Sequence, residues 1–132
     1  MQSSQLIDLG TSARAMAESQ LKLQVSEGEN VESIESEVVF LLNAGWSLDE
    51  ENMGLKGSFT FTSFAKAADF LHTLFVQSKI RDHHAEIYNM HKLVKLHWTT
   101  HRPRGISAKD TQMAMWCHEQ ALLLGGKYVT EA

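Results

Sequence analysis

The chain has 132 residues, 43% of them hydrophobic, and its 12 Lys and Arg against 16 Asp and Glu give a formal net charge of −4. A chain of this length and composition can bury a core without a metal or a disulfide, which predicts one compact domain and argues against a two-domain enzyme. The acidic balance argues against direct nucleic-acid binding, which needs a concentrated positive field, and apolar stretches of four or five residues are too short to cross a membrane.

The first part of the chain divides into a polar segment and a helix. Residues 1–30 are rich in Ser, Gln, Glu and Gly, and we expect them to form a flexible or loosely docked extension. From Val31 onward, apolar residues recur at helical spacing, which predicts an amphipathic helix over 31–44 that ends at Gly45.

A hairpin and a second helix are expected next. Strict alternation over 58–62 predicts a strand that places Phe59 and Phe61 on one face, paired in a hairpin with residues 46–49. Ser63 is a good N-cap for the helix that follows, which we expect to end at residues 81–84. The apolar face expected for this helix consists of Phe64, Ala67, Ala68, Leu71, Leu74 and Phe75.

The last third of the chain predicts two strands and a helix. Alternating apolar and polar residues over 91–100 predict a half-buried strand, preceded by a short strand near 86–89. Ser107 and Asp110 have capping-box spacing and open a final helix that ends at the glycine pair 125–126. Cys117 lies on its apolar side, where it is expected to be a buried small hydrophobe.

The order of these elements predicts the fold class. Helix, strand, strand, helix, strand, strand, helix suits an α+β domain with a four-stranded antiparallel sheet and helices packed on one face. We place this domain at residues 31–126, with 127–132 as a tail. One cysteine cannot form an internal disulfide, so we expect a cytoplasmic protein, with nuclear and organellar locations left open.

Histidine is the unusual component of the sequence, because five of its seven histidines lie within nineteen residues. His83 and His84 follow a predicted helix and His101 follows a predicted strand, so these ends of elements can converge on one cleft with Asp110. Imidazole has an ordinary pKa of about 6.5, so neighbouring histidines can donate and accept protons at neutral pH. The cluster therefore indicates acid/base chemistry.

Each of these residues also has a structural interpretation. His83 and His84 can interact with a helix dipole, His101 can be a loop residue, and capping alone can explain Asp110. We expect His91 and His97 to be structural. A zinc site of His83, His91 and His101 is conceivable, but no carboxylate or Cys stands at a recognised ligand spacing, so we expect no metal.

The spacing of the cluster resembles the signature of pterin-4a-carbinolamine dehydratases. The shared pattern is Lys79-x-x-x-His83-His84, then His101 eighteen residues after His83, then Asp110 nine residues later. The resemblance covers about residues 38–124 and includes Leu42-x-x-x-Gly45-Trp46 and the Phe59-x-Phe61-x-x-Phe64 run.

This resemblance implies an enzyme that dehydrates 4a-hydroxytetrahydrobiopterin to quinonoid dihydropterin, without a cofactor, in tetrahydrobiopterin recycling. It implies His83 and His101 as the acid/base pair and His84 as the residue that mainly holds the pterin. Ala85 and Thr100 would form pocket wall, and Asp110 would orient a histidine or favour its protonated form. The same helix-on-sheet fold and a homodimer or homotetramer are implied as well.

Two further expectations follow from the resemblance. Some family members serve as dimerisation partners of transcription factors, so the alternative is a non-catalytic scaffold or partner-binding protein of the same fold. The sequence also departs from the family at Ala85, Ile87, His91 and Lys79, where Pro, Trp, Tyr and Glu are usual. We expect these departures to alter pocket shape and rate more than reaction type.

Overall fold

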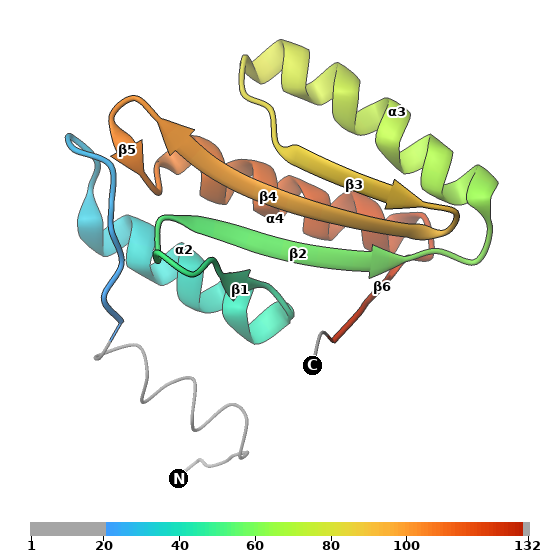
Figure 1. Cartoon of the computed structure of the whole chain (residues 1–132), viewed down its shortest axis with the longest axis horizontal. Coiled ribbons are helices and arrows are strands. Elements are labelled where there is room, and N and C mark those ends of the chain that lie inside the picture. Colours follow the sequence, from blue (N-terminus) through green and yellow to red (C-terminus); the bar gives the residue numbers. More distant parts are fainter. Residues whose placement is uncertain (1–20, 131–132) are drawn as a thin grey trace, which may run out of the picture.

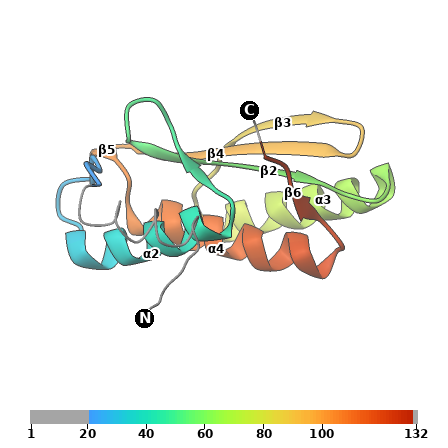
Figure 2. The same cartoon turned by 90° about the horizontal axis from the view of Figure 1, so that it is seen from below.

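The structure, a computed structural model, describes residues 21–130. Three helices lie against one face of an antiparallel sheet (Figures 1 and 2), which confirms the α+β fold class and the helix-on-sheet arrangement. The helices are α2 (Val31–Ala44), α3 (Phe64–Arg81) and α4 (Ala108–Leu123). The strands are β1 (Ser47–Leu48), β2 (Gly54–Thr60), β3 (Glu86–Met90), β4 (Leu93–His101), β5 (Arg104–Gly105) and β6 (Lys127–Tyr128).

The sheet has six strands instead of the expected four, because two short strands join its central path. The path runs β1-β2-β4-β3, and β5 pairs with β4 while β6 pairs with β2. In the central pair, Leu55 lies opposite Trp98 and Phe59 lies opposite Val94. All four of these side chains are fully buried under the helices, so the pairing of β2 with β4 carries the core.

Helices α2 and α3 are capped at both ends, and the predicted caps Gly45 and Ser63 are among these residues. The Asn30 side chain accepts a hydrogen bond from the Ser33 amide at 3.0 Å, and Ser63 Oγ accepts one from the Lys66 amide at 3.2 Å. Gly45 ends α2 at φ 138°, and a Cβ there would lie 2.7 Å from the ring of Tyr128. Asp82 ends α3 in the left-handed conformation, at φ 52°.

The buried face of α3 differs from the predicted one. Phe64 and Phe75 are each 54% exposed, whereas Ala67, Phe70 and Leu74 are buried. Helix α3 covers the border of the sheet, so a narrower stripe, centred on Phe70, contacts the core. The Phe70 ring lies 5.3 Å from Phe61 and 6.0 Å from Phe59, which confirms that both predicted strand phenylalanines face the core.

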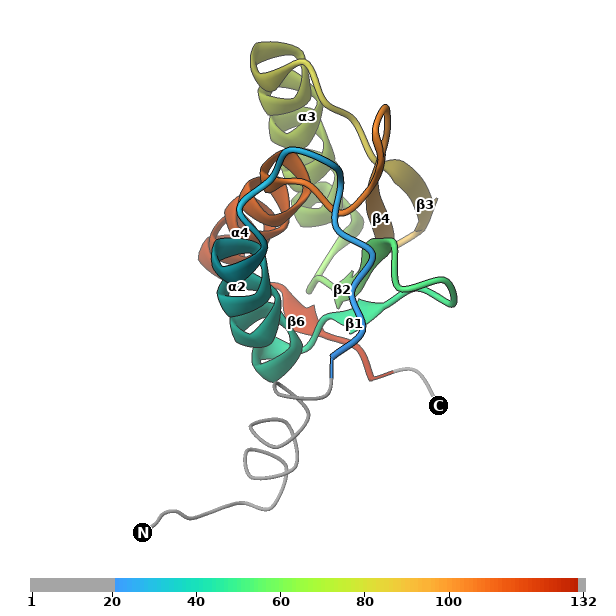
Figure 3. The ribbon, with the colours of Figure 1, turned by 90° about the vertical axis from the view of Figure 1, so that its left-hand side faces the viewer.

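The polar segment before α2 is docked on the domain over its described part, residues 21–30, which we call the strap. The Gln24 carbonyl accepts from the Ile106 amide and the Ile106 carbonyl accepts from the Ser26 amide, both at 2.9 Å. The strap thus runs beside the β5 turn (Figures 1 and 3). Residues 21–30 therefore contact the domain expected from residue 31 onward, because their backbone groups pair with those of Ile106. Residues 1–20 lie outside the described residues.

The expected tail also contributes to the domain over residues 127–130. Strand β6 pairs with β2, and the Trp46 indole N–H donates to the Tyr128 hydroxyl at 2.8 Å. His118 Nδ1 lies 2.7 Å from the same hydroxyl. Residues 127 and 128 therefore contact β2, Trp46 and His118.

Two further findings concern the core and the length of the helices. Cys117 is completely buried in the core, as expected, and burial raises the pKa of its thiol, which keeps the sulfur protonated. Within residues 21–130, no helix combines the length and the apolar character needed to cross a membrane.

Candidate active site

A cleft of about 520 Å³ opens where β4, the loop after α3, the strap and the start of α4 meet. This volume lies within the range of pockets that hold small molecules. The cleft wall includes every site residue named from the sequence except Asp110, which lies beneath it: His83, His84, Ala85, Thr100 and His101. The ends of elements therefore converge as expected from the sequence.

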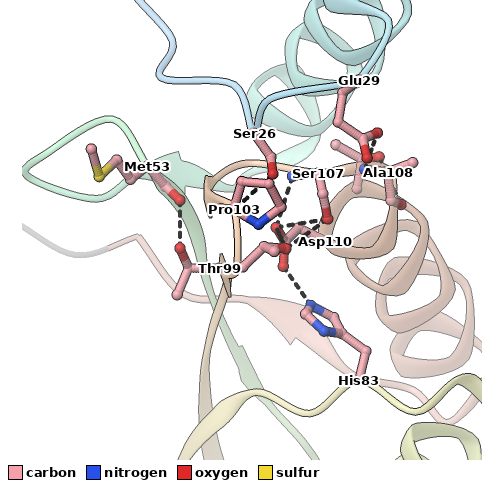
Figure 4. Close-up of polar contacts among 11 residues, drawn as sticks. Ser26, Glu29, Met53, His83, Thr99, Pro103, Ser107, Ala108 and Asp110 are labelled. Atoms are coloured by element: carbon pink, nitrogen blue, oxygen red, sulfur yellow. Dashed lines mark hydrogen bonds and ion pairs between the residues drawn. The ribbon is translucent and has the colours of Figure 1, made fainter.

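A buried carboxylate forms the floor of the cleft. Asp110 is in the first turn of α4 and is completely buried. Its Oδ2 accepts hydrogen bonds from the Ser107 amide at 2.9 Å and from Thr100 Oγ1 at 2.7 Å. Its Oδ1 lies 2.6 Å from His83 Nε2 (Figure 4). A carboxylate with this many donors is held in one orientation, so Asp110 caps the helix and orients His83 at the same time.

His83 is fixed in the cleft by a carboxylate and an aromatic ring. Its side chain is only 12% exposed, and its ring stacks on Trp98 with centroids 5.5 Å apart. Because an ionised carboxylate can only accept, the nitrogen facing Asp110 carries a proton. The opposite nitrogen, Nδ1, points away from Asp110 and is the ring position available for proton exchange with a molecule in the cleft.

His84 and His101 line the same cleft from its exposed side. His84 comes directly before Ala85 in the loop between α3 and β3, and His101 is the last residue of β4. No residue within 21–130 forms a hydrogen bond with either ring. Both imidazoles are therefore free to bind a ligand, in contrast to His83.

Sequence reasoning assigned a structural role to His97, which also lines the cleft. Its Nε2 lies 2.8 Å from Asp49 Oδ2 and its Nδ1 lies 2.8 Å from Glu86 Oε1. Burial opposes the charged ring, but the hydrogen bonds to Glu86 and Asp49 outweigh burial and raise the pKa of His97. The sequence signal for this position is strand alternation, which places His97 on the same face of β4 as His101 and so on the side of the cleft.

The structure does not support the conceivable zinc site. His91 has φ 56° in the turn between β3 and β4, at the end of β4 opposite to His101, and its ring contacts Phe64. Within residues 21–130, no three His, Cys, Asp or Glu side chains are arranged to hold a metal ion. His91 therefore lies outside the cleft that His83 and His101 line.

Comparison with known proteins places these residues in a family context. A family model described as "Pterin 4 alpha carbinolamine dehydratase" matches residues 29–120, which include the whole histidine cluster and Asp110.

Among curated proteins, two relatives are named "Putative pterin-4-alpha-carbinolamine dehydratase". The one from Novosphingobium aromaticivorans is 33% identical over 69 residues, covering 52% of this chain and 72% of the relative. The one from Dinoroseobacter shibae is 34% identical over 74 residues, covering 56% of this chain and 76% of the relative.

A solved structure shares the fold. It is the crystal structure of "transcriptional coactivator/pterin dehydratase" from Brucella melitensis, with a TM-score of 0.60 and 29% sequence identity. The match covers 66% of this chain and 95% of that chain.

Proposed function

The chain belongs to the pterin 4 alpha carbinolamine dehydratase family, and from this premise we propose that it catalyses the dehydration of 4a-hydroxytetrahydrobiopterin to quinonoid dihydropterin and water. The observation that carries the proposal is the contact of 2.6 Å between His83 and buried Asp110 in a cleft that also holds His84 and His101. We further propose that this reaction belongs to tetrahydrobiopterin recycling in the cytoplasm.

The reaction requires two proton movements. The bond between C4a and its hydroxyl oxygen breaks, and the oxygen leaves as water after it receives a proton; a ring N–H of the pterin loses a proton. We assign these steps to His83 and His101, one as acid and one as base, because each can reach a ligand in the same cleft. Positioned groups of this kind accelerate proton transfer about 100-fold to 10,000-fold.

His83 and His101 differ in how they are held, and this difference suits them to paired roles. Asp110 fixes the ring of His83 through a contact of 2.6 Å, while His101 is exposed at the rim of the cleft. His84 is free of protein hydrogen bonds, so we assign to it the binding of the pterin, with Ala85 and Thr100 as pocket wall.

The test compares dehydration rates of 4a-hydroxytetrahydrobiopterin, generated in a coupled hydroxylase reaction, for wild type and His101→Ala. We expect a clear acceleration by wild type and a loss of about 100-fold or more in the variant. His72→Ala is the matched control, because His72 is an exposed histidine of α3 that does not line the cleft. A wild-type rate equal to the spontaneous one would overturn the proposal.

A second candidate function is a non-catalytic scaffold or dimerisation partner of the same fold. The observation that favours it is the exposure of large apolar side chains on α3, where Phe64 and Phe75 are 54% and Ile80 is 70% exposed. The relative from Brucella melitensis is described as a coactivator as well as a dehydratase. A homodimer or homotetramer would cover such a surface, and mass measurement in solution tests that assembly.

A further inference from the structure

One group of charged side chains, of which Glu86 and His97 line the cleft, has no part in the proton transfers described above. It consists of Asp49 in the turn after β1, Glu86 at the start of β3 and His97 on β4, and we call it the carboxylate–histidine chain. His97 lies between the two carboxylates, with one ring nitrogen 2.8 Å from each of them. Glu86 and His97 are also opposite residues in the β3–β4 pairing.

The carboxylate–histidine chain is held from its Asp49 end. Asp49 Oδ1 accepts from the Met53 amide at 2.9 Å and from the Glu51 amide at 3.2 Å, so the turn fixes this carboxylate. A Cβ on Gly54 would lie 2.5 Å from Asp49 Oδ2 and 2.7 Å from His97 Nε2. The close approach of the two side chains therefore depends on a glycine at position 54.

Glu86 is the member of the carboxylate–histidine chain that faces the cleft at its open end. Its carboxylate retains free acceptor positions. Its side chain is 79% exposed, and within residues 21–130 its only hydrogen bond is the one to His97. A carboxylate offers about four acceptor positions, so the bond to His97 leaves most of them open. An exposed glutamate ordinarily samples many rotamers. The Glu86 side chain is instead oriented by the His97 ring, which Asp49 holds in place.

The open acceptors define the ligand group that would bind. Each ring nitrogen of His97 faces a carboxylate oxygen, so the imidazole offers no free N–H to a ligand, and the positions that remain open are the acceptors of Glu86. Such a site binds a group that presents adjacent N–H donors, and the pyrimidine ring of a pterin has this pair, its 2-amino group and its N3–H. Two parallel hydrogen bonds to one carboxylate add both strength and geometric specificity.

We propose that Glu86 is a specificity-determining residue that binds the 2-amino and N3–H edge of the pterin, and that His97 is a positioning residue that holds Glu86 in place. This inference rests on the proposed function, since it names the ligand edge recognised in the same cleft. It assigns recognition to the Glu86 side of the cleft and proton transfer to the His83 and His101 side.

The test measures binding, so that it does not depend on catalysis. The probes are pterin and lumazine, which differ in the 2-position: lumazine carries an oxygen there and lacks the amino donors. Fluorescence titrations give the ratio of the two dissociation constants for wild type, Glu86→Gln and His97→Gln. Glu50→Gln is the matched control, because Glu50 lies in the same turn as Asp49 and outside the cleft wall.

We expect wild type and Glu50→Gln to favour pterin over lumazine by about tenfold or more, the size of a charge-assisted hydrogen bond. Glu86→Gln should bring the ratio close to one, and His97→Gln should lower it to an intermediate value. A general structural defect would weaken both probes equally, so the ratio isolates the proposed role.

The outcomes separate this inference from the proposed function. A wild type that binds both probes equally, or a Glu86→Gln variant that retains the preference, overturns the inference while the dehydration rate still decides the function. Wild type that binds neither probe overturns the inference and removes the support of a pterin site as well.

Discussion

Each end of α4 contacts the sheet through a histidine, and the two histidines differ in their partners and in their access to solvent. At the N-terminal end, His83 stacks on Trp98 and its Nε2 lies 2.6 Å from Asp110. At the C-terminal end, His118 stacks on Tyr128 with centroids 5.8 Å apart and bonds its hydroxyl at 2.7 Å.

The difference between the two ends lies in the partner and in the access to solvent. His83 pairs with a carboxylate and lines a cleft, so its ring can exchange protons with a ligand. His118 pairs with a phenol whose pKa is raised to about 12, mainly by burial, so that neighbour stays neutral at ordinary pH. We therefore propose a chemical role for His83, which has a charged partner and access to a cleft, and a structural role for His118, which has neither.

The largest effect is expected at the N-terminal end, from Asp110→Asn. The variant keeps the shape but removes the buried charge that accepts from Ser107, Thr100 and His83. We expect activity to fall at least 100-fold and the free energy of unfolding to fall by about 3 kcal/mol. Rate measurements and urea titrations check both values, with exposed Asp69→Asn as control. An unchanged stability would contradict the assigned network.

His84→Ala should separate activity from stability within the cleft. The ring is exposed and free of protein hydrogen bonds, so we expect a thermal midpoint within about 1 °C of wild type. Loss of the pterin contact should raise KM about tenfold or more. Steady-state kinetics and thermal melts are the measurements. Parallel losses in both would show that His84 is structural.

Tyr128→Phe should produce the opposite pattern at the C-terminal end. The variant deletes the hydroxyl that accepts from the Trp46 indole at 2.8 Å and contacts His118. We expect a loss of about 1–2 kcal/mol in the free energy of unfolding and an unchanged rate per folded molecule. Tyr88→Phe, on an exposed tyrosine of β3, is the control for urea titration. A reduced rate would connect the two ends of α4.

Glu29→Ala should have a smaller effect, at the start of α4. Glu29 Oε1 accepts from the Ala108 amide at 2.9 Å, one of the helix N–H groups that lack an intrahelical partner. We expect a loss of about 1 kcal/mol in the free energy of unfolding. Glu27→Ala is the control, since Glu27 is an exposed residue of the strap. Equal losses in both variants would remove the capping role from Glu29.

The smallest effect concerns pH and His97. Its folded-state pKa is raised, so its contribution to stability is complete below the ordinary value of about 6.5 and disappears as pH rises through the higher folded value. The difference in the free energy of unfolding between wild type and His97→Gln should therefore shrink as pH rises from about 6 to about 9, because this range begins near the ordinary pKa and extends above it. Urea titrations across this range give the difference, and a constant value would contradict the assignment.

Asp49 makes a contribution to stability that is lost at acid pH. Burial opposes its ionisation, but hydrogen bonds from His97 and the turn amides outweigh burial, and its pKa lies below the ordinary 3.8. Its contribution is therefore present above that value and is lost as pH falls through the lower folded pKa. The same titrations extended to acid pH should show this second loss.

Local patterns predicted most of the fold because they are set by short-range physics. Asn30, Gly45 and Ser63 mark helix limits through hydrogen bonds and backbone conformations that involve neighbours in sequence. Alternation predicted that Phe59 and Phe61 face the core. The exposed Phe64 and Phe75 escaped prediction, since periodicity gives an apolar face without stating how much of it the sheet covers.

Within the site, the sequence predicted that the ends of elements converge, but it did not indicate the contacts that strand pairing makes. His83, His84 and His101 line one cleft above the buried Asp110, because a helix end, a strand end and a capping box meet there. His97 needed the register of β4 with β3, which brings Glu86 opposite to it. Docking of the strap likewise depends on partners such as Ile106 that local sequence does not reveal.

The strap has a consequence for the order in which the protein folds. Ser26 Oγ donates to the Pro103 carbonyl across 77 positions of sequence, and the Ala108 amide donates to Glu29 across 79. Contacts that close such long loops cost more chain entropy than the local turns of α2 or the β3–β4 hairpin. We therefore expect the wall of the cleft beside α4 to close after the hairpin and helices have formed, which makes a competent binding site one of the last products of folding.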